Sequence, residues 1–293
     1  MKQLVAFYAL ILLCNCAFAQ QIYLDSVFSE LNISTHTYHD TLQFDYYVAD
    51  RNRQNAPLIV LVRGGGFVGG ARNSDDMVSF AKQLAFRGYV VASVSYRLTM
   101  VGIDFGCDVA RDKKVEAINA ASNDVELAVK YLIENRKLFR FNQNKVVVLG
   151  SSAGAEAVLN MVYVRKKTAF DFNYAGIISL AGAIISPDKI NVETTIPSQF
   201  FHGTGDELVP YQVAPHHYCQ TNDDGYMMLY GSKAIADRLK GLGKPYYLYS
   251  VSGGSHSWAT LPMTNCLDEI TDFLLNDVID AKSVRQTERM INN

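Results

Sequence analysis

The order of hydrophobic and polar residues predicts strands that alternate with helices along most of the chain. Residues 58–62 (LIVLV) are an unbroken run of leucine and β-branched residues, as expected for a strand buried on both faces. Ser74 can cap a helix that ends near Gly88, and residues 89–95 (YVVASVS) form the next buried strand. The same reasoning predicts later strands at 145–149, 177–181, 198–202 and 246–251, and later helices at 123–136, 152–165, 232–242 and 267–277.

This alternation predicts the α/β fold class. Strands joined by helices need crossover connections, which give a mainly parallel sheet whose ligands gather at the carboxyl ends of the strands. Residues 35–48, which end in LQFDYYV, alternate as one or two antiparallel strands ahead of that sheet. No linker rich in proline, glycine or serine divides the sequence, so we expect one domain over 20–293, with 100–122 as a surface excursion near the site.

The first residues have the pattern of a targeting segment. A positive start is followed by an apolar run at 4–13 and by AFA, which ends at Ala19 and gives small residues at −3 and −1 of a cleavage site. We therefore expect a signal peptide over 1–19 and a secreted or periplasmic mature chain without a transmembrane segment, since this run is too short to span a bilayer. The alternatives are a buried N-terminal helix and a lipoprotein signal at Cys14 or Cys16, neither of which directly follows small residues.

Length and hydrophobic content limit the size of the fold, and net charge limits the kinds of partner. A chain of 293 residues, 49% of them hydrophobic, can bury one large α/β domain or two small ones. Its formal charge of −2 gives no reason to expect a nucleic-acid or anionic-membrane partner.

Three cysteines remain beyond the predicted signal peptide, and their spacing bears on redox chemistry. No C-x-x-C pair occurs, so we expect neither a metal site nor dithiol redox chemistry. One disulfide and one free thiol would suit an oxidising compartment. Cys219 with Cys266 is the pair that we favour, which leaves Cys107 free, and three unpaired, mostly buried thiols are the alternative.

A glycine-rich stretch follows the first buried strand, and two functions are possible for it. Gly64, Gly66 and Gly69 fit the G-x-G-x-x-G spacing of a dinucleotide-binding loop, which needs an acidic residue at the end of the second strand. That strand ends in SYR at Arg97, without an acid, and the next helix begins too late to place its N-terminus on a pyrophosphate. The competing chemistry is a loop that presents backbone N–H groups to an oxygen anion during acyl transfer, and the motifs below favour it.

The sequence GSSAG at 150–154 matches G-x-S-x-G directly between a predicted strand and a predicted helix. A sharp turn there strains the central serine, admits only small neighbours and lifts the hydroxyl to the top of the sheet. Ser152 is therefore our candidate nucleophile, and an ordinary helix cap is the alternative interpretation.

A serine nucleophile needs a histidine base, and that histidine needs a carboxylate. His256 lies in VSGGSHSW, between the strand at 246–251 and the last predicted helix. Asp206 lies in FFHGTGDELVPY, just after another strand, and its neighbour Glu207 is the rival acid. Ser152, Asp206 and His256 follow the order nucleophile, acid, base that the α/β-hydrolase fold uses. We assign the other histidines no catalytic role: His36 and His39 on an early hairpin, His202 as structural, and His216 and His217 facing solvent, with a pocket lining as the alternative for this last pair.

At these residues the sequence resembles the α/β-hydrolase superfamily, and most closely its carboxylesterase branch with an H-G-G-G-type oxyanion loop. The matching stretches are RGGGFVGG, SYRL, GSSAG, HGTGDELVP and GGSHSW. The resemblance implies a mostly parallel, twisted sheet with helices on both faces and antiparallel strands at the N-terminal edge. The sequence is similar in particular to compact secreted bacterial esterases, including those that remove acetyl or feruloyl groups from plant polysaccharides.

The resemblance also implies a mechanism. A serine esterase of this kind forms an acyl-enzyme without metal or organic cofactor, and its substrate is a small ester or an acylated carbohydrate. The N–H groups of Gly65, Gly66 and Ala153 would form the oxyanion hole. Arg63 stands where many members have histidine; because the backbone donors act rather than this side chain, we expect the same class of reaction.

Four aromatic residues are candidates for pocket walls, although such residues more often belong to the core: Phe67, Tyr96, Phe105 and Trp258. Arg97 is expected to brace loops through hydrogen bonds rather than to touch substrate. Two other functions stay open at this point, a peptidase of the same fold and a hydrolase-fold protein that binds without catalysis, whose usual sign is a missing triad residue.

Overall fold

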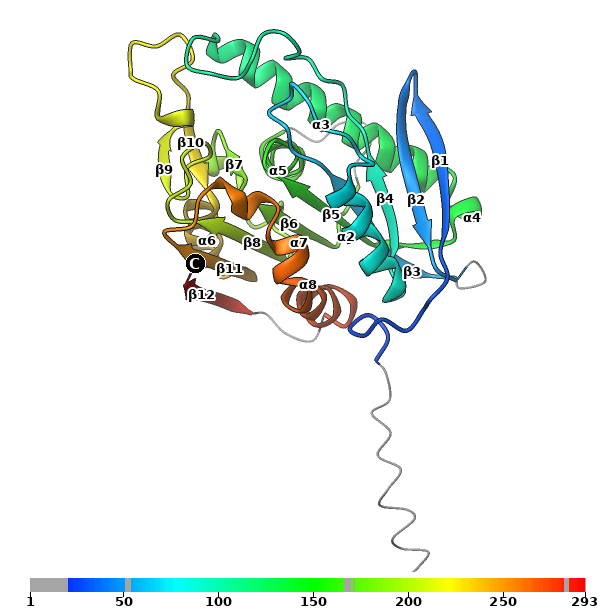
Figure 1. Ribbon diagram of the computed structural model, residues 1–293. Coiled ribbons are helices and arrows are strands. Elements are labelled where there is room, and N and C mark those ends of the chain that lie inside the picture. Colours follow the sequence, from blue (N-terminus) through cyan, green and yellow to red (C-terminus); the bar gives the residue numbers. More distant parts are fainter. Residues whose placement is uncertain (1–20, 51–53, 166–169, 171, 282–284, 293) are drawn as a thin grey trace, which may run out of the picture.

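The computed structural model describes residues 21–50, 54–165, 170, 172–281 and 285–292 (Figure 1). The predicted signal peptide and its cleavage site lie outside the described residues. Within those ranges, no helix is both long enough and apolar enough to cross a bilayer.

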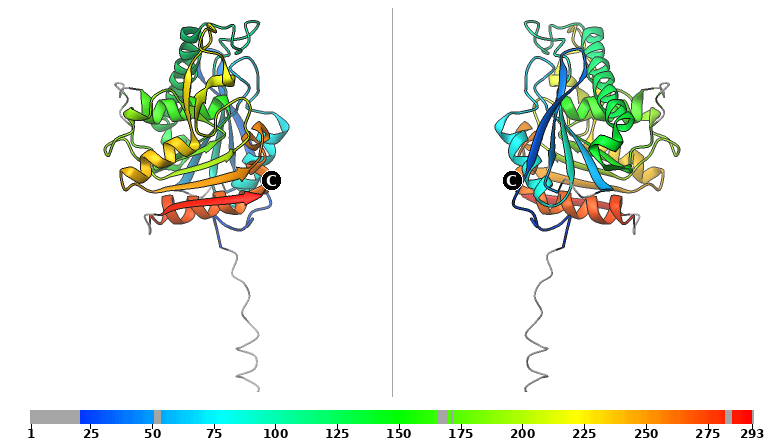
Figure 2. Two further views of the ribbon diagram at one scale, coloured as in Figure 1. Left: turned by 90° about the vertical axis from the view of Figure 1, so that its left-hand side faces the viewer. Right: turned by 90° about the vertical axis from the view of Figure 1, so that its right-hand side faces the viewer.

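A nine-stranded sheet forms the centre of the molecule, in the order β1-β2-β4-β3-β5-β6-β8-β11-β12. Its strands are β1 (Asn32–His39), β2 (Leu42–Val48), β3 (Ala56–Val62), β4 (Val90–Val94), β5 (Phe141–Ser151), β6 (Gly176–Leu180), β8 (Ser198–Gly203), β11 (Tyr246–Ser252) and β12 (Gln286–Asn292). β1 pairs with β2 and β2 with β4 in antiparallel fashion, whereas all pairs from β4 to β12 are parallel. The side views show the twist of the sheet, since β12 lies almost across the direction of β1 (Figure 2). The predicted mostly parallel sheet with an antiparallel N-terminal edge is confirmed.

Helices cover both faces of the sheet, as predicted. They are α2 (Asp75–Phe86), α3 (Arg111–Glu134), α4 (Arg136–Phe139), α5 (Ala153–Leu159), α6 (Ser232–Gly241), α7 (Pro262–Asn265) and α8 (Leu267–Phe273). The central strand β3 is buried along its whole length and sends alternate side chains to opposite faces. Leu58, Val60 and Val62 pack in one core with α3, α5 and α6, while Ile59 and Leu61 pack in the other with α2, α7 and α8.

A second, smaller sheet stands beside the main one (Figure 1). Its three strands are β7 (Ala183–Ile184), β10 (Met228–Gly231) and β9 (Val213–Pro215), all antiparallel.

A hydrogen-bonded ion pair connects the end of β4 to α3. Arg97, just after β4, donates its backbone N–H and its Nε to Asp124 of α3, each at 2.8 Å. Arg97 therefore braces the fold as expected from its sequence.

The structure corrects several boundaries. The predicted excursion at 100–122 is half helix, because α3 begins at Arg111, twelve residues before the predicted start at 123. The early turns of α3 (RDKKVE) carry mostly charged residues and lack an apolar period, so the pattern fails there. The predicted helices after Ser152 and Leu267 change partway into π-helical turns, at Asn160–Val164 and Leu274–Ile279. β12 (QTERMIN) is mostly polar and gave no strand signal.

Candidate active site

Ser152 lies at the turn from β5 to α5, in a conformation that a tight turn imposes. Its φ is 50° and its ψ is −122°, in a region that residues with a side chain rarely adopt. The flanking glycines are required by space: a Cβ on Gly150 would lie 2.4 Å from the oxygen of Gly154, and one on Gly154 would lie 2.3 Å from the oxygen of Val62. The turn therefore holds the Ser152 hydroxyl at the end of the sheet, in the manner of a nucleophile elbow.

The three residues of the predicted triad meet at this turn. Oγ of Ser152 lies 2.8 Å from Nε2 of His256, and Nδ1 of the same ring lies 2.8 Å from Oδ2 of Asp206. His256 begins a 3₁₀ turn (His256–Ala259) after β11, and Asp206 lies in the loop after β8. The carboxylate on Nδ1 selects the tautomer with its proton there, which leaves Nε2 free to accept from the hydroxyl.

Asp206, rather than Glu207, contacts the imidazole. The Glu207 carboxylate instead accepts the backbone N–H of His256 at 3.3 Å. Asp206 is 1% exposed, and its Oδ1 accepts two backbone N–H groups of its own loop, each at 2.9 Å. Burial alone would raise the pKa of Asp206, but hydrogen bonds from His202 and His256 outweigh it and hold the pKa well below its usual range. The acid is therefore ionised at neutral pH.

A second histidine supports this carboxylate. His202, in β8, is fully buried, and its Nε2 lies 3.3 Å from Oδ2 of Asp206 and 3.0 Å from the backbone oxygen of Val209. Because both neighbours are acceptors, Nε2 carries the proton, and Nδ1 accepts from the Ser232 hydroxyl at 2.9 Å. His202, expected from the sequence to be structural only, therefore also contacts the predicted acid. The pattern HGTGD, with the histidine at a strand end four residues before the acid, is the signal that could have found this contact.

The glycine-rich loop after β3 folds tightly beside the nucleophile. Gly65 and Gly66 have φ values of 124° and 60°, which favour glycine. A Cβ on Gly65 would lie 2.2 Å from the oxygen of Gly69, and the Gly69 N–H donates to the Gly65 oxygen at 3.0 Å. Nε of Arg63 donates to the Ser74 hydroxyl at 3.0 Å, which ties the loop to the start of α2. Arg63 thus stabilises the loop through its side chain.

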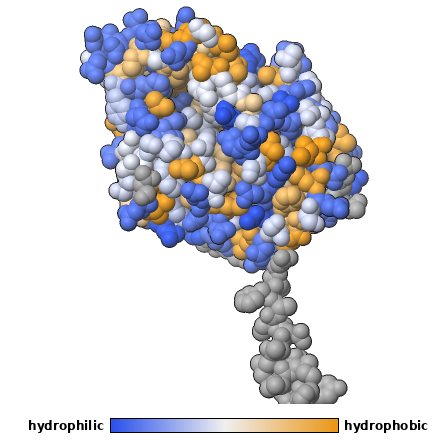
Figure 3. Space-filling model, viewed as in Figure 1, coloured by the Kyte–Doolittle hydropathy of each residue, from blue (hydrophilic) through white to orange (hydrophobic). Residues whose placement is uncertain are grey.

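A cavity of ≈ 570 Å³ adjoins these groups, within the range of small-molecule sites. Its lining includes Ser152, His256, Gly65, Gly66 and Ala153. Hydrophobic residues are scattered among hydrophilic ones over the face that Figure 3 shows. The predicted nucleophile, the predicted base and the predicted oxyanion donors therefore share one hollow.

The other walls of the cavity differ from the predicted ones. Phe105 lines it, but the rings of Phe67 and Trp258 are buried in the core and are not among its described lining residues. Tyr96 also lies outside that lining: it borders a much smaller hollow behind the glycine loop and donates to the backbone oxygen of Arg63 at 3.0 Å. An aromatic residue next to a motif is as readily packed beneath the loop as exposed above it.

His216 and His217 line the cavity, so the prediction that they face solvent is wrong. The two rings stack with their centroids 4.0 Å apart, and His216 is 2% exposed. Burial, followed by the nearby His217 and Lys114, lowers the pKa of His216 to about 2. At neutral pH this ring is therefore uncharged.

Comparison with known proteins agrees with this geometry. The BD-FAE family model matches residues 44–183, just under half of the chain, including the glycine loop and the serine turn. A medium-chain fatty acyl-CoA hydrolase precursor of Anas platyrhynchos is 32% identical over 42% of this chain and 21% of its own length, and cholinesterase 2 of Branchiostoma lanceolatum is 35% identical over 35% and 29%. A thermophilic esterase of Thermogutta terrifontis with propionate bound superposes with a TM-score of 0.61 at 17% identity, over 83% of this chain and 93% of that one.

The chain therefore has the fold of α/β-hydrolase esterases, and part of its sequence is similar to the BD-FAE family and to carboxylesterases. The chain covers less than a third of the length of the two relatives above. Esterase 2 of Thermogutta terrifontis phosphoramylated by tabun also shares the fold, with a TM-score of 0.61 at 18% identity over 83% of this chain and 94% of that one.

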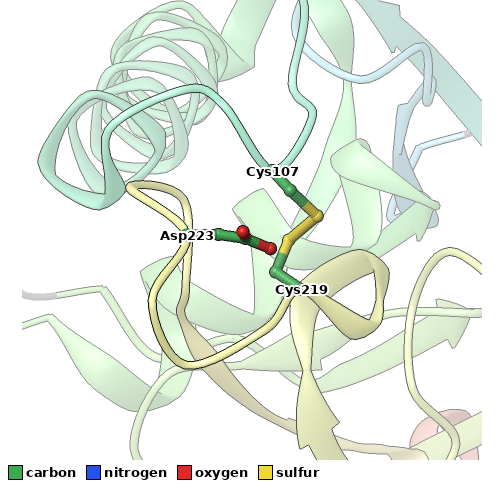
Figure 4. Close-up of side chains that lie close together, drawn as sticks. All are labelled: Cys107, Cys219 and Asp223. Carbon is green, nitrogen blue, oxygen red and sulfur yellow. A yellow bond between two sulfur atoms is a disulfide. The ribbon is translucent and has the colours of Figure 1, made fainter.

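The disulfide joins Cys107 to Cys219, so the favoured pair of Cys219 and Cys266 is wrong (Figure 4). Cys266 is a free, buried thiol, and burial raises its pKa to about 12. The error has a physical cause: the bridge spans 112 residues, and only the folded chain brings the two loops together. The bridge links the loop that carries Phe105 to the segment that carries His217, which are two walls of the cavity.

Asp223 lies beside this bridge, and its carboxylate and the two sulfurs are within 4.8 Å of one another (Figure 4). Both sulfurs are bonded to each other, so neither is the thiolate that a metal site would need. Oδ2 of Asp223 accepts the backbone N–H of Gln220 at 2.7 Å. The carboxylate therefore shapes the loop of Cys219.

Replacing His202 with phenylalanine should slow catalysis more than it weakens binding. We expect ester-hydrolysis kcat to fall by about 10- to 100-fold with little change in KM, because Asp206 would lose a donor and hold the His256 ring less well. His39→Phe, on the exposed edge strand β1, is the matched control and should keep the wild-type kcat. Equal kcat values for the two variants would contradict the positioning role.

Replacing both Cys107 and Cys219 with serine should loosen the two cavity walls that the bridge joins. We expect the free energy of unfolding to fall by about 2–5 kcal/mol and KM to rise more than kcat falls. Urea unfolding and steady-state kinetics measure the two effects. Cys266→Ala removes a cysteine without removing the bridge and should keep KM. An unaltered KM in the double variant would show that the bridge does not hold the cavity.

Proposed function

We infer that this protein is a secreted or periplasmic serine carboxylic-ester hydrolase that acts through Ser152, His256 and Asp206. The observation that carries the proposal is the continuous contact from hydroxyl to imidazole to carboxylate, at 2.8 Å each, beside a cavity. A hydroxyl bonded to an imidazole whose tautomer is set by a buried carboxylate is the arrangement that activates serine. The match to the BD-FAE family over residues 44–183 and the likeness to carboxylesterases support the same class of reaction.

The proposed reaction has two halves. His256 accepts the proton of Ser152 at Nε2 while Oγ attacks the ester carbon, and it then gives this proton to the departing alcohol. Water enters, loses a proton to the same nitrogen and attacks the acyl-enzyme; the proton returns to Ser152 as the acid leaves. Asp206 stays ionised and stabilises the imidazolium in both halves.

Backbone N–H groups would stabilise the oxyanion that each attack creates. The proposed donors are Gly65 and Gly66 in the glycine loop and Ala153 at the start of α5, and all three line the cavity beside Ser152. These donors would lower the activation barrier, because the negative charge on the oxygen develops only in the transition state. Arg63 would contribute by tying the loop to α2 rather than by donating to the oxygen.

The cavity supports esters of short acyl or aromatic acyl groups, including esters of carbohydrates. Its volume of ≈ 570 Å³ admits such groups, and Val68, Leu208, Val209 and Phe105 supply apolar surface. Polar side chains line the same cavity, among them Glu156, His216 and His217, which suits a hydroxylated alcohol such as a sugar. The propionate-bound and butyrate-bound esterases of the same fold offer a parallel for short acyl groups.

Export is proposed from two observations. Residues 1–19 have the charge, apolar run and small residues of a cleavable signal peptide. The Cys107–Cys219 disulfide suits an oxidising compartment. Mass spectrometry of the chain recovered from outside the cytoplasm should give an N-terminus at Gln20.

The test of the activity is hydrolysis of 4-nitrophenyl acetate, butyrate and longer-chain esters, together with a feruloyl ester, by the wild type and by Ser152→Ala. We expect the variant to lose at least about 1,000-fold in kcat, because no other group attacks the acyl carbon. Ser151→Ala is a matched control, since the Ser151 hydroxyl donates to the Ala259 oxygen and not to His256.

The alternatives predict different results. A peptidase would cleave aminoacyl amides in preference to these esters, and a binding protein would hydrolyse none of them. Full activity in Ser152→Ala would contradict the proposed nucleophile.

A further inference from the structure

Glu156 is a carboxyl group that the proposed reaction does not use. It lies on α5, four residues after Ser152, and its backbone N–H donates to the Ser152 oxygen at 2.9 Å. The rest of α5 (AGAEAVL) consists of small or apolar residues, and Glu156 is 2% exposed. A carboxyl group buried in such surroundings is costly and calls for a reason.

The side chain of Glu156 lines the cavity and has hydrogen-bonding capacity to spare. Its Oε1 is buried and has no hydrogen-bond partner among the described residues. Ser152 and Glu156 line the same cavity. The free carboxyl oxygen is therefore within reach of a group on a substrate held at Ser152.

Burial decides the charge of this carboxyl group. Burial, with repulsion from the Asp206 carboxylate, raises the pKa of Glu156 to about 8, although Lys114 partly opposes the shift. At neutral pH the group is mainly protonated, so it both donates and accepts a hydrogen bond.

His216 supplies a second hydrogen-bonding group to the same cavity. Lys114 lies with Nζ 3.5 Å from Nδ1 of His216 and donates to the Gly225 oxygen at 3.0 Å. An ammonium group beside Nδ1 makes this nitrogen the acceptor, so Nε2 of the neutral ring carries the proton. The Phe105 ring packs edge-on to His216 with centroids 4.9 Å apart and fixes its orientation.

We propose that Glu156 and His216 form a specificity subsite that binds a hydroxyl group of the ester substrate. A hydroxyl can accept from one of these groups and donate to the other, which neither an alkyl chain nor an isolated cation can do. The Cys107–Cys219 bridge holds the Phe105 and His217 loops against each other and so keeps the subsite in shape. The inference rests on the proposed ester hydrolysis and names the substrate class of that site.

The experiment compares kcat/KM for two pairs of esters that differ in hydroxyl groups. Ethyl 3-hydroxybutyrate with ethyl butyrate places the hydroxyl on the acyl side, and glyceryl monobutyrate with propyl butyrate places it on the alcohol side. The full chain is used as wild type, Glu156→Leu, Glu156→Gln and His216→Phe. Glu116→Leu, at an exposed position of α3, is the matched control.

We expect the wild type to prefer the hydroxylated ester by at least about fivefold in one of the pairs, the pair telling which side of the ester enters the subsite. Glu156→Leu and His216→Phe should bring this ratio to about one. Glu156→Gln keeps a donor and an acceptor and should retain most of the preference, as should Glu116→Leu. The ratio within a pair separates recognition from a general loss of folded protein.

Two results would overturn the inference alone: Ser152-dependent hydrolysis with no hydroxyl preference in either pair, or a preference that survives in both Glu156→Leu and His216→Phe. If Glu156→Leu does not fold, His216→Phe and Glu156→Gln decide the matter by the same ratio. The absence of any Ser152-dependent hydrolysis of the four esters would overturn the proposed function and the inference with it.

Discussion

The close approach of two backbone segments is the constraint on which the site depends. The end of β3 leads into the glycine loop, and the end of β5 turns sharply at Ser152. A Cβ on Gly154 would lie 2.3 Å from the Val62 oxygen, and one on Gly64 would lie 2.7 Å from the Ser151 oxygen. Only glycine permits so close a contact. The contact fixes the hydroxyl of Ser152 beside the backbone of the loop. Nucleophile and proposed oxyanion donors are thus set by one packing requirement.

The charge of Asp206 depends on a different balance, between burial and hydrogen bonding. Asp206 is almost completely removed from water, which on its own would favour the neutral acid. Two imidazoles and two backbone N–H groups surround the carboxylate and keep it ionised. Among the described residues, no donor reaches the buried Oε1 of Glu156, one turn beyond Ser152, and this carboxyl group is mainly neutral. Two buried carboxyl groups beside one cavity therefore differ in charge because their surroundings differ. This difference suits the roles proposed for them, since Asp206 would stabilise an imidazolium and Glu156 would bind a neutral group.

Sequence patterns predicted the parts of the fold that local chemistry determines. The unbroken apolar run of β3 and the small residues around Ser152 have direct structural causes, so both could be recognised without coordinates. The partner of Cys219 could not, because it depends on how two distant loops meet. The cavity walls were missed for a similar reason: aromatic residues such as Phe67 and Trp258 pack below the loops that carry them. The start of α3 was missed because tertiary contacts, including burial of Lys114, stabilise a segment with a polar sequence.

The central claim is that His256 activates Ser152, and the most direct measurement is covalent labelling by a fluorophosphonate. Intact-mass and peptide analysis of the wild type should give one adduct per chain, on Ser152. The labelling rate should fall by at least about 1,000-fold in His256→Ala, since an unassisted serine hydroxyl is a poor nucleophile. An adduct on another residue, or equal labelling rates for the wild type and His256→Ala, would contradict the account.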